Sequence, residues 1–153
     1  MPLFWWNVSL KDRITFFNVN LAKSLLVGAL LGGFYWFVFK KGGGSLGFNF
    51  DIFGVALVTA VVEELTFSGF ILGYLSKNTK FSKNLLLVLV GGLVVLSRLP
   101  ILFFDFHLPL SQVFFVSLIV FGTSVLNGFV RVWSGNVAGS IVARLLLNLA
   151  TLI

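Results

Sequence analysis

The stretch DIFGVALVTAVVEELTFSGFILGYL, residues 51–75, decides the fold, because the adjacent carboxylates of Glu63 and Glu64 interrupt a long apolar run there. An apolar run of this length predicts a membrane-spanning helix, since about 20 such residues cross the hydrocarbon layer. An ionised carboxylate in that layer costs roughly 2.5–3.5 kcal/mol on insertion scales. We therefore expect both glutamates to face the protein interior or a wet cavity and to have polar partners there.

The composition of the whole chain agrees with a membrane protein. Of its 153 residues, 58% are hydrophobic and only 10% are charged, which is unlike a soluble domain of this length. The apolar runs are continuous and rich in Leu, Val and Phe, so they indicate helices and not the alternating strands of a barrel. We expect an all-α fold, a polytopic membrane helical bundle without cysteine chemistry, because the chain has no cysteine.

Five transmembrane helices are predicted, preceded by a short N-terminal interfacial helix. The amphipathic pattern of residues 8–22 indicates a helix that lies on the bilayer. The five spans are expected at residues 21–39, 48–75, 84–104, 111–131 and 137–153, with a glycine turn at 42–44. Pro100 predicts a kink or break near the end of the third span. The chain then divides into an interfacial segment (1–22), a first span with its glycine-rich turn (23–46) and a four-helix core (47–153).

The basic residues predict the orientation. Most of them flank the apolar runs, as expected for contact with anionic headgroups, and no soluble basic face indicates nucleic-acid binding. One side of the membrane holds Lys11, Arg13, Lys23, Lys77, Lys80, Lys83 and Arg131, whereas the loops on the other side hold Lys40 and Lys41. Because positive charge favours the inner side, we expect the N-terminus inside. No cleavable signal or organellar targeting segment is evident, which indicates the cytoplasmic (inner) membrane.

Glycines recur at four-residue spacing, which permits close contact between helices in lipid. The pairs are Gly28/Gly32, Gly69/Gly73 and Gly135/Gly139. We expect close packing first at Gly69/Gly73, because that pair shares a helix with the two glutamates.

Four ionisable residues fall inside the predicted spans, namely Glu63, Glu64, Arg98 and Arg144. Their charges sum to zero, and buried charges are tolerated when they are paired. We therefore expect the arginines to meet the glutamates across the bundle. Two interpretations are open: a salt-bridge network that sets helix register, or a polar site that binds or transforms a ligand.

The residue types disfavour a bound metal. The single histidine, His107, lies in the predicted loop after the third span and is expected to be an ordinary loop residue. Arginine cannot ligate a metal because it stays protonated, and zinc sites use several His, Cys or carboxylate ligands. Glu63 and Glu64 alone would hold a cation weakly. We expect neither a metal nor another cofactor.

Three motifs fall in order on the second, third and fifth predicted spans. They are EELTFSGF (63–70), LVVLSRLP (93–100) and SGNVAGSIVARLLLNL (134–149). They resemble the motifs EE-x-x-FRGF, F-x-x-x-H-L-P and H-x-x-x-N of the CAAX protease and bacteriocin-processing family of intramembrane proteases, also called the type II CAAX prenyl endopeptidase or abortive-infection family. The resemblance covers about residues 50–150. It implies a four-helix core, a membrane endopeptidase activity and a membrane or prenylated peptide or protein as partner, besides the lipid bilayer.

The sequence departs from that pattern at several motif positions. Ser68 stands at the family's arginine, Val94 at its phenylalanine, and Arg98 and Arg144 at its two histidines, while Glu63, Glu64 and Asn148 are retained. The resemblance implies that Glu63 would activate a water, with the histidines and the asparagine orienting it and stabilising the oxyanion.

Arginine at both histidine positions changes the expected chemistry. Two guanidinium groups should keep both carboxylates charged and salt-bridged, which makes a poor general base and leaves no imidazole to share a proton. We therefore expect a catalytically impaired family member that acts as a membrane-embedded binding or scaffold protein. The alternative is an active endopeptidase with Glu63 as base and Arg144 and Asn148 as oxyanion stabilisers. A third hypothesis, a small transport or channel subunit, lacks internal repeats and paired broken helices.

Overall fold

The computed structural model describes residues 20–40 and 49–152, and this part of the chain is helical apart from short connections. The helices are α2 (Leu21–Phe39), α3 (Phe50–Glu64), α4 (Leu72–Asn78), α5 (Lys83–Pro100), α6 (Leu110–Ser134) and α7 (Ala138–Leu152). Two π-helical turns accompany them, η1 (Leu65–Ile71) between α3 and α4 and η2 (Ile101–Asp105) after α5. The glycine turn and residues 8–19 of the predicted interfacial helix lie outside the described residues, while Asn20 is the N-cap residue of α2 and residues 21 and 22 belong to that helix.

Four described segments are long and apolar enough to cross a membrane. They are Leu21–Phe39, Phe50–Asn78, Lys83–Asp105 and Leu110–Ser134, and their ends lie within three residues of the predicted spans. The fifth predicted span corresponds to α7, whose 15 residues extend only about 22 Å at 1.5 Å each. Large apolar side chains cover much of the outer surface, as expected where the solvent is lipid. The prediction of an all-α polytopic membrane bundle is confirmed.

Local sequence explains where several helices begin and end. Asn49 and Ser82 precede α3 and α5, and each side chain accepts a hydrogen bond from a backbone N–H of the first turn, which is the usual N-cap arrangement. Pro100 is the last residue of α5 and is followed by η2, so the predicted break is present. Gly135 ends α6 with φ 71°, a left-handed conformation that suits glycine.

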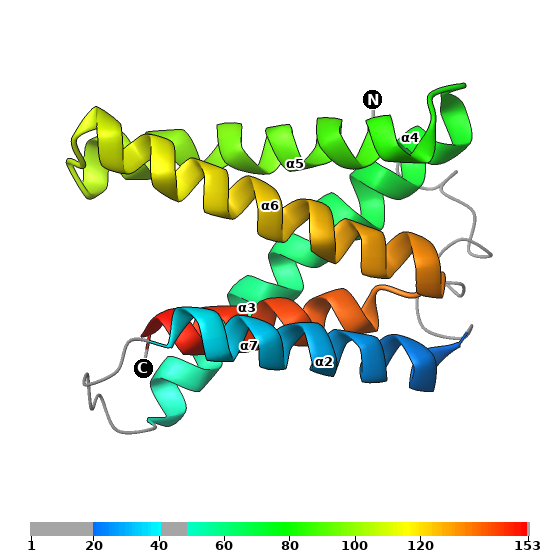
Figure 1. Cartoon of the computed structure of the whole chain (residues 1–153), viewed down its shortest axis with the longest axis horizontal. Coiled ribbons are helices and arrows are strands. Elements are labelled where there is room, and N and C mark those ends of the chain that lie inside the picture. Colours follow the sequence, from blue (N-terminus) through cyan, green and yellow to red (C-terminus); the bar gives the residue numbers. More distant parts are fainter. Residues whose placement is uncertain (1–19, 41–48, 153) are drawn as a thin grey trace, which may run out of the picture.

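The helices form two pairs joined by a diagonal segment (Figure 1). One pair is α2 with α7, and the other is α5 with α6. The continuous segment of α3, η1 and α4 crosses obliquely between them, with α3 packed on α7 and η1 in contact with both α5 and α6. The junction of α3 and η1 therefore lies where the two pairs come together, and this junction carries the two glutamates.

The closest helix contact joins α2 to α7. A Cβ placed on Gly28 would collide with the carbonyl oxygen of Gly139, and one placed on Gly32 would collide with the side chain of Leu146. The expectation that close packing would come first at Gly69/Gly73 is wrong for Gly73, because a Cβ added there would meet no atom within 4 Å. The reason is that Gly73 lines a pocket, so the space beside it is open.

Candidate functional site

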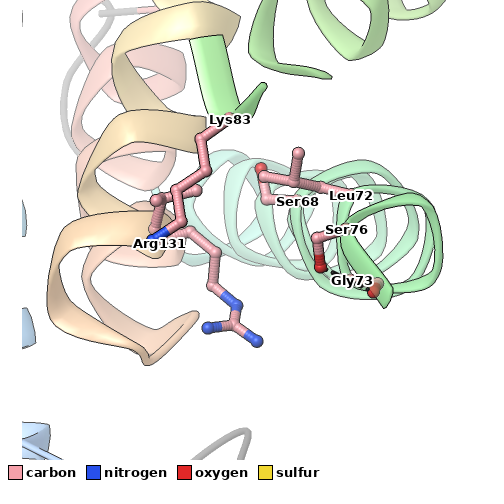
Figure 2. A pocket seen from close by; sticks show the side chains of 7 residues that line it. Ser68, Leu72, Gly73, Ser76, Lys83 and Arg131 are labelled. Atoms are coloured by element: carbon pink, nitrogen blue, oxygen red, sulfur yellow. Dashed lines mark hydrogen bonds between the residues drawn. The ribbon is translucent and has the colours of Figure 1, made fainter. Parts of the chain in front are cut away.

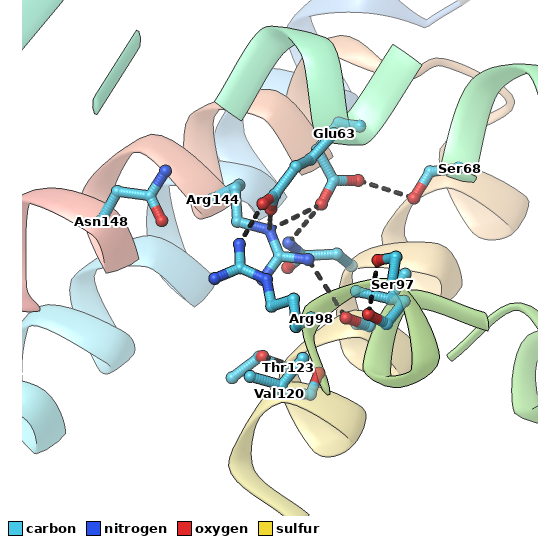
Figure 3. A network of polar contacts seen from close by, with 12 residues as sticks. Glu63, Ser68, Ser97, Arg98, Val120, Thr123, Arg144 and Asn148 are labelled. Carbon is cyan, nitrogen blue, oxygen red and sulfur yellow. Dashed lines mark hydrogen bonds and ion pairs between the residues drawn. The ribbon is translucent and has the colours of Figure 1, made fainter. Parts of the chain in front are cut away.

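Glu63 and Glu64 are the last two residues of α3, immediately before η1. Figure 3 shows Glu63 facing Arg144 and Arg98. The Glu64 side chain is 2% exposed and that of Glu63 is 18% exposed. Such burial of two carboxylates is tolerated only when their oxygens have charged or hydrogen-bonding partners. The surrounding helices supply those partners.

The arginines of α5 and α7 meet the glutamates, as the charge balance predicts. The Nε of Arg144 lies 3.3 Å from Oε2 of Glu63 and 3.1 Å from Oε1 of Glu64. Arg98 forms an ion pair with the other oxygen of Glu63. Arg144 is 4% exposed, whereas Arg98 is 33% exposed. The four side chains thus form a neutral cluster with a buried end at Glu64 and a more open end at Arg98.

Two neutral side chains complete the shell of Glu64. Ser68, in η1, donates a hydrogen bond of 2.6 Å to Oε2, and Asn127, in α6, donates one of 2.8 Å to Oε1. In the π-helical turn a backbone N–H bonds to the fifth residue before it, as Leu72 does to Phe67, and such turns occur often at functional sites. Ser68 comes from this turn.

A second layer of contacts reaches helix α2. The hydroxyl of Tyr35 donates to Oδ1 of Asn127 at 3.1 Å. Because an ionised carboxylate only accepts, the amide of Asn127 must turn its NH₂ to Glu64 and its oxygen to Tyr35. Arg144 also donates from Nη2 to the hydroxyl of Ser124 at 3.1 Å. The polar cluster therefore draws on α2, α3, η1, α5, α6 and α7.

Asn148 does not reach either carboxylate in this structure. It shares α7 with Arg144, but its amide donates to the carbonyl oxygen of Ala56 at 3.3 Å. Ala56 lies about two turns before Glu63 along α3, and Figure 3 shows Asn148 to one side of the cluster. Of the residues predicted to form the site, the structure brings together all except this asparagine.

The side chains of the cluster do not form a binding site for a divalent cation. Each of the four carboxylate oxygens already lies beside a guanidinium, amide or hydroxyl group, although Oε2 of Glu63 meets Arg144 at 3.3 Å without a hydrogen bond. Within residues 20–40 and 49–152, no three His, Cys, Asp or Glu side chains form a group that would hold a metal. His107 lies in the exposed loop after η2, with Nδ1 3.1 Å from the carbonyl oxygen of Asp105.

Three members of the cluster, namely Tyr35, Ser124 and Asn127, were not predicted from the sequence. A signal for two of them is present, because Thr123, Ser124 and Asn127 put polar side chains in the middle of an otherwise apolar span. Polar residues there are usually satisfied by another helix. Tyr35 carries no comparable signal, since a tyrosine in a span also occurs at lipid interfaces.

The fold and the cluster together define a polytopic membrane protein with a buried, charge-neutral polar centre at a helix crossing. The family model described as Rce1-like, type II CAAX prenyl endopeptidase, matches residues 45–150, and the chain belongs to this family. The matched segment carries both glutamates, both arginines, Ser68 and Asn127. No curated protein and no solved structure shows a significant match to the chain.

Proposed function

We propose that this chain is a divergent member of its family in which the glutamate site is catalytically impaired, and that the bundle acts as a membrane-embedded binding or scaffold protein. One observation carries the proposal: every carboxylate oxygen of Glu63 and Glu64 is hydrogen-bonded or ion-paired within the chain, although Oε2 of Glu63 is held only by the 3.3 Å ion pair to Arg144 and accepts no hydrogen bond. Two of the partners are guanidinium groups at the positions where relatives have histidine.

The proposal follows from what a general base has to do. It must present a free lone pair to a water within about 2.6–3.2 Å and accept the proton of that water. Arg98 and Arg144 compete with water for the lone pairs of Glu63. Neither arginine replaces an imidazole, because a guanidinium gives up no proton at relevant pH. Apart from the glutamates themselves, the described cluster therefore offers no group that could pass a proton on to a leaving amine.

Stabilisation of an oxyanion is impaired in the same way. Arg144 uses Nε for the glutamates and Nη2 for Ser124, and Asn148 uses its amide for Ala56. Stabilising an oxyanion requires donors already aimed at an empty position. These donors are instead aimed at groups within the protein, which supports a binding or structural role for the cluster.

The alternative is an active endopeptidase that uses Glu63, with Arg144 and Asn148 assisting. The observation in its favour is the asymmetry of the cluster, because Glu63 and Arg98 are 18% and 33% exposed while Glu64 is buried. A membrane or prenylated peptide that displaced Arg98 would give a water access to Glu63. We infer this class of partner, a membrane or prenylated peptide, from the family.

A cleavage assay separates the two functions. Wild type, Glu63→Gln and the double variant Arg98→His with Arg144→His are incubated with prenylated-peptide and transmembrane reporters. The proposal expects no cleavage by wild type, and it allows cleavage by the double variant if the histidines are all that is missing. Adding Glu63→Gln to the double variant is the matched control and must remove any restored activity. Cleavage by wild type that disappears in Glu63→Gln would overturn the proposal in favour of the alternative.

We also propose that the protein lies in the cytoplasmic membrane with its N-terminus inside. The described cations support this orientation. The starts of α2 and α5 and the ends of α4 and α6 share one side, because consecutive spans run in opposite directions. That side holds Lys23, Lys77, Lys80, Lys83 and Arg131, whereas Lys40, Asp51 and Asp105 lie on the other. The excess of positive charge marks the inner side.

A further inference from the structure

A pocket of about 190 Å³ lies where the segment ending in α4 meets the start of α5 and the end of α6. Figure 2 shows Lys83 and Arg131 on one side and Ser68, Leu72 and Ser76 on the facing helix. Its volume is several times the roughly 30 Å³ that one water occupies in the liquid. The pocket therefore has room for a small polar group.

The charge around the pocket is positive. Lys83 has no acidic partner among the described residues, in which the carboxylates outside the cluster are Asp51 and Asp105. Asp51 lies in the first turn of α3 and Asp105 is the last residue of η2, so each lies at the end of its helical segment that is far from the pocket. Arg131 lines the same wall. The ammonium of Lys83, which has no acidic partner in the described part of the chain, favours binding of an anion in the pocket.

The position of the pocket corresponds to the headgroup layer. Lys83 is the first residue of α5, and Arg131 and Ser76 lie near the ends of α6 and α4. Trp133, in the last turn of α6, is exposed, and the ammonium of Lys23 lies 3.9 Å from the centroid of its ring. Exposed tryptophan beside lysine is typical of the boundary between lipid and water. Lipid phosphates lie at this depth.

We propose that this pocket binds a phosphate group, supplied by the headgroup of an anionic phospholipid. A guanidinium matches two phosphate oxygens at once, and an ammonium adds a point charge. Basic pockets between membrane helices on the inner side bind such headgroups. The hydroxyl of Ser76 now donates to the carbonyl oxygen of Gly73 at 2.8 Å and can turn toward a ligand by rotating about χ1.

Ser68 joins this pocket to the buried cluster. It lines the pocket and donates its hydroxyl proton to Glu64. An anion in the pocket would therefore lie one side chain away from the carboxylates. The phosphate site does not depend on whether the cluster is catalytic.

Binding is tested on the full-length protein purified in a non-ionic detergent. The probes are short-chain phosphatidic acid, short-chain phosphatidylcholine and inorganic phosphate, and the readouts are native mass spectrometry and thermal melting. Phosphatidic acid should bind wild type and raise its melting temperature, and phosphatidylcholine should bind more weakly. Each of Lys83→Gln and Arg131→Gln should weaken binding of phosphatidic acid about fivefold, since losing one partly exposed ion pair to the bound phosphate corresponds to about that factor.

Lys80→Gln is the matched control, because it removes the same charge on the same side of the membrane but outside the pocket. The affinity of this variant for phosphatidic acid should stay within about twofold of wild type. If inorganic phosphate competes with phosphatidic acid, the pocket also binds free phosphate. If it does not compete, the pocket binds the phosphate only as part of a lipid. Arg131 is half-buried, so Lys83→Gln keeps the test valid if the Arg131 variant does not fold. Equal binding by wild type and Lys83→Gln, or equal binding of the two lipids, would overturn the proposal.

Discussion

Replacing Glu64 by glutamine should destabilise the bundle more than the same change at Glu63. Glu64 is 2% exposed, and its loss leaves Arg144, itself 4% exposed, with only one carboxylate. Breaking a buried ion pair by removing one partner costs about 3–5 kcal/mol, and we expect about 3 kcal/mol because glutamine keeps an oxygen for the amide of Asn127. Glu63 and Arg98 are partly exposed, so water compensates and the expected loss for Glu63→Gln is about 1–2 kcal/mol.

The measurement is the free energy of unfolding from titration with a denaturing detergent in mixed micelles, followed by tryptophan fluorescence. The double variant Glu64→Gln with Arg144→Gln is the control. It leaves no unpaired charge at the buried end of the cluster, so it should lose less than the sum of the two single variants. A loss below about 1 kcal/mol for Glu64→Gln, or strict additivity in the double variant, would refute a coupled buried ion pair.

Three further predictions concern the packing and the orientation of the helices. Tyr35→Phe should cost about 1 kcal/mol of unfolding free energy, because it removes the hydroxyl that links α2 to the cluster; no loss would show that this hydrogen bond is dispensable. Gly28→Ala should destabilise by at least about 2 kcal/mol, because its Cβ meets backbone of α7 that cannot move cheaply. Gly33→Ala is its control, since the space around Gly33 is open, and equal effects of the two would contradict the close contact. Because the chain has no cysteine, Lys80→Cys should react only with reagent inside and Asp105→Cys only with reagent outside. The reverse labelling would disprove the proposed orientation.

Hydropathy and motif spacing predicted most of the helical organisation. The predicted span 84–104 corresponds to α5 with η2, and the predicted span 111–131 corresponds to α6, each to within three residues. This agreement is expected, because apolar length and flanking charge are local properties of the chain. The pairing of glutamates with arginines was also predictable, since four charges that sum to zero have few ways to be buried. The catalytic roles of these residues stay predictions.

Asn148 shows where such reasoning stops. Its four-residue spacing from Arg144 puts both on one face of α7, yet Arg144 contacts Glu64 while Asn148 contacts Ala56. The difference arises because α3 crosses α7 obliquely, so a neighbour one turn away on α7 meets a different level of α3. Spacing along one helix cannot reveal the crossing angle with another.

The sequence by itself determined that this protein is a helical membrane bundle of its family, with two acids and two bases in the hydrophobic layer. Only the tertiary structure decided that Asn127 and Tyr35 complete the polar cluster, that α2 packs closely on α7 through Gly28, and that Lys83 and Arg131 share a pocket. The physical reason is that burial in lipid requires charges to be paired whatever the arrangement. Which neutral donors reach those charges depends on helix rotation and crossing, which only the packed bundle sets.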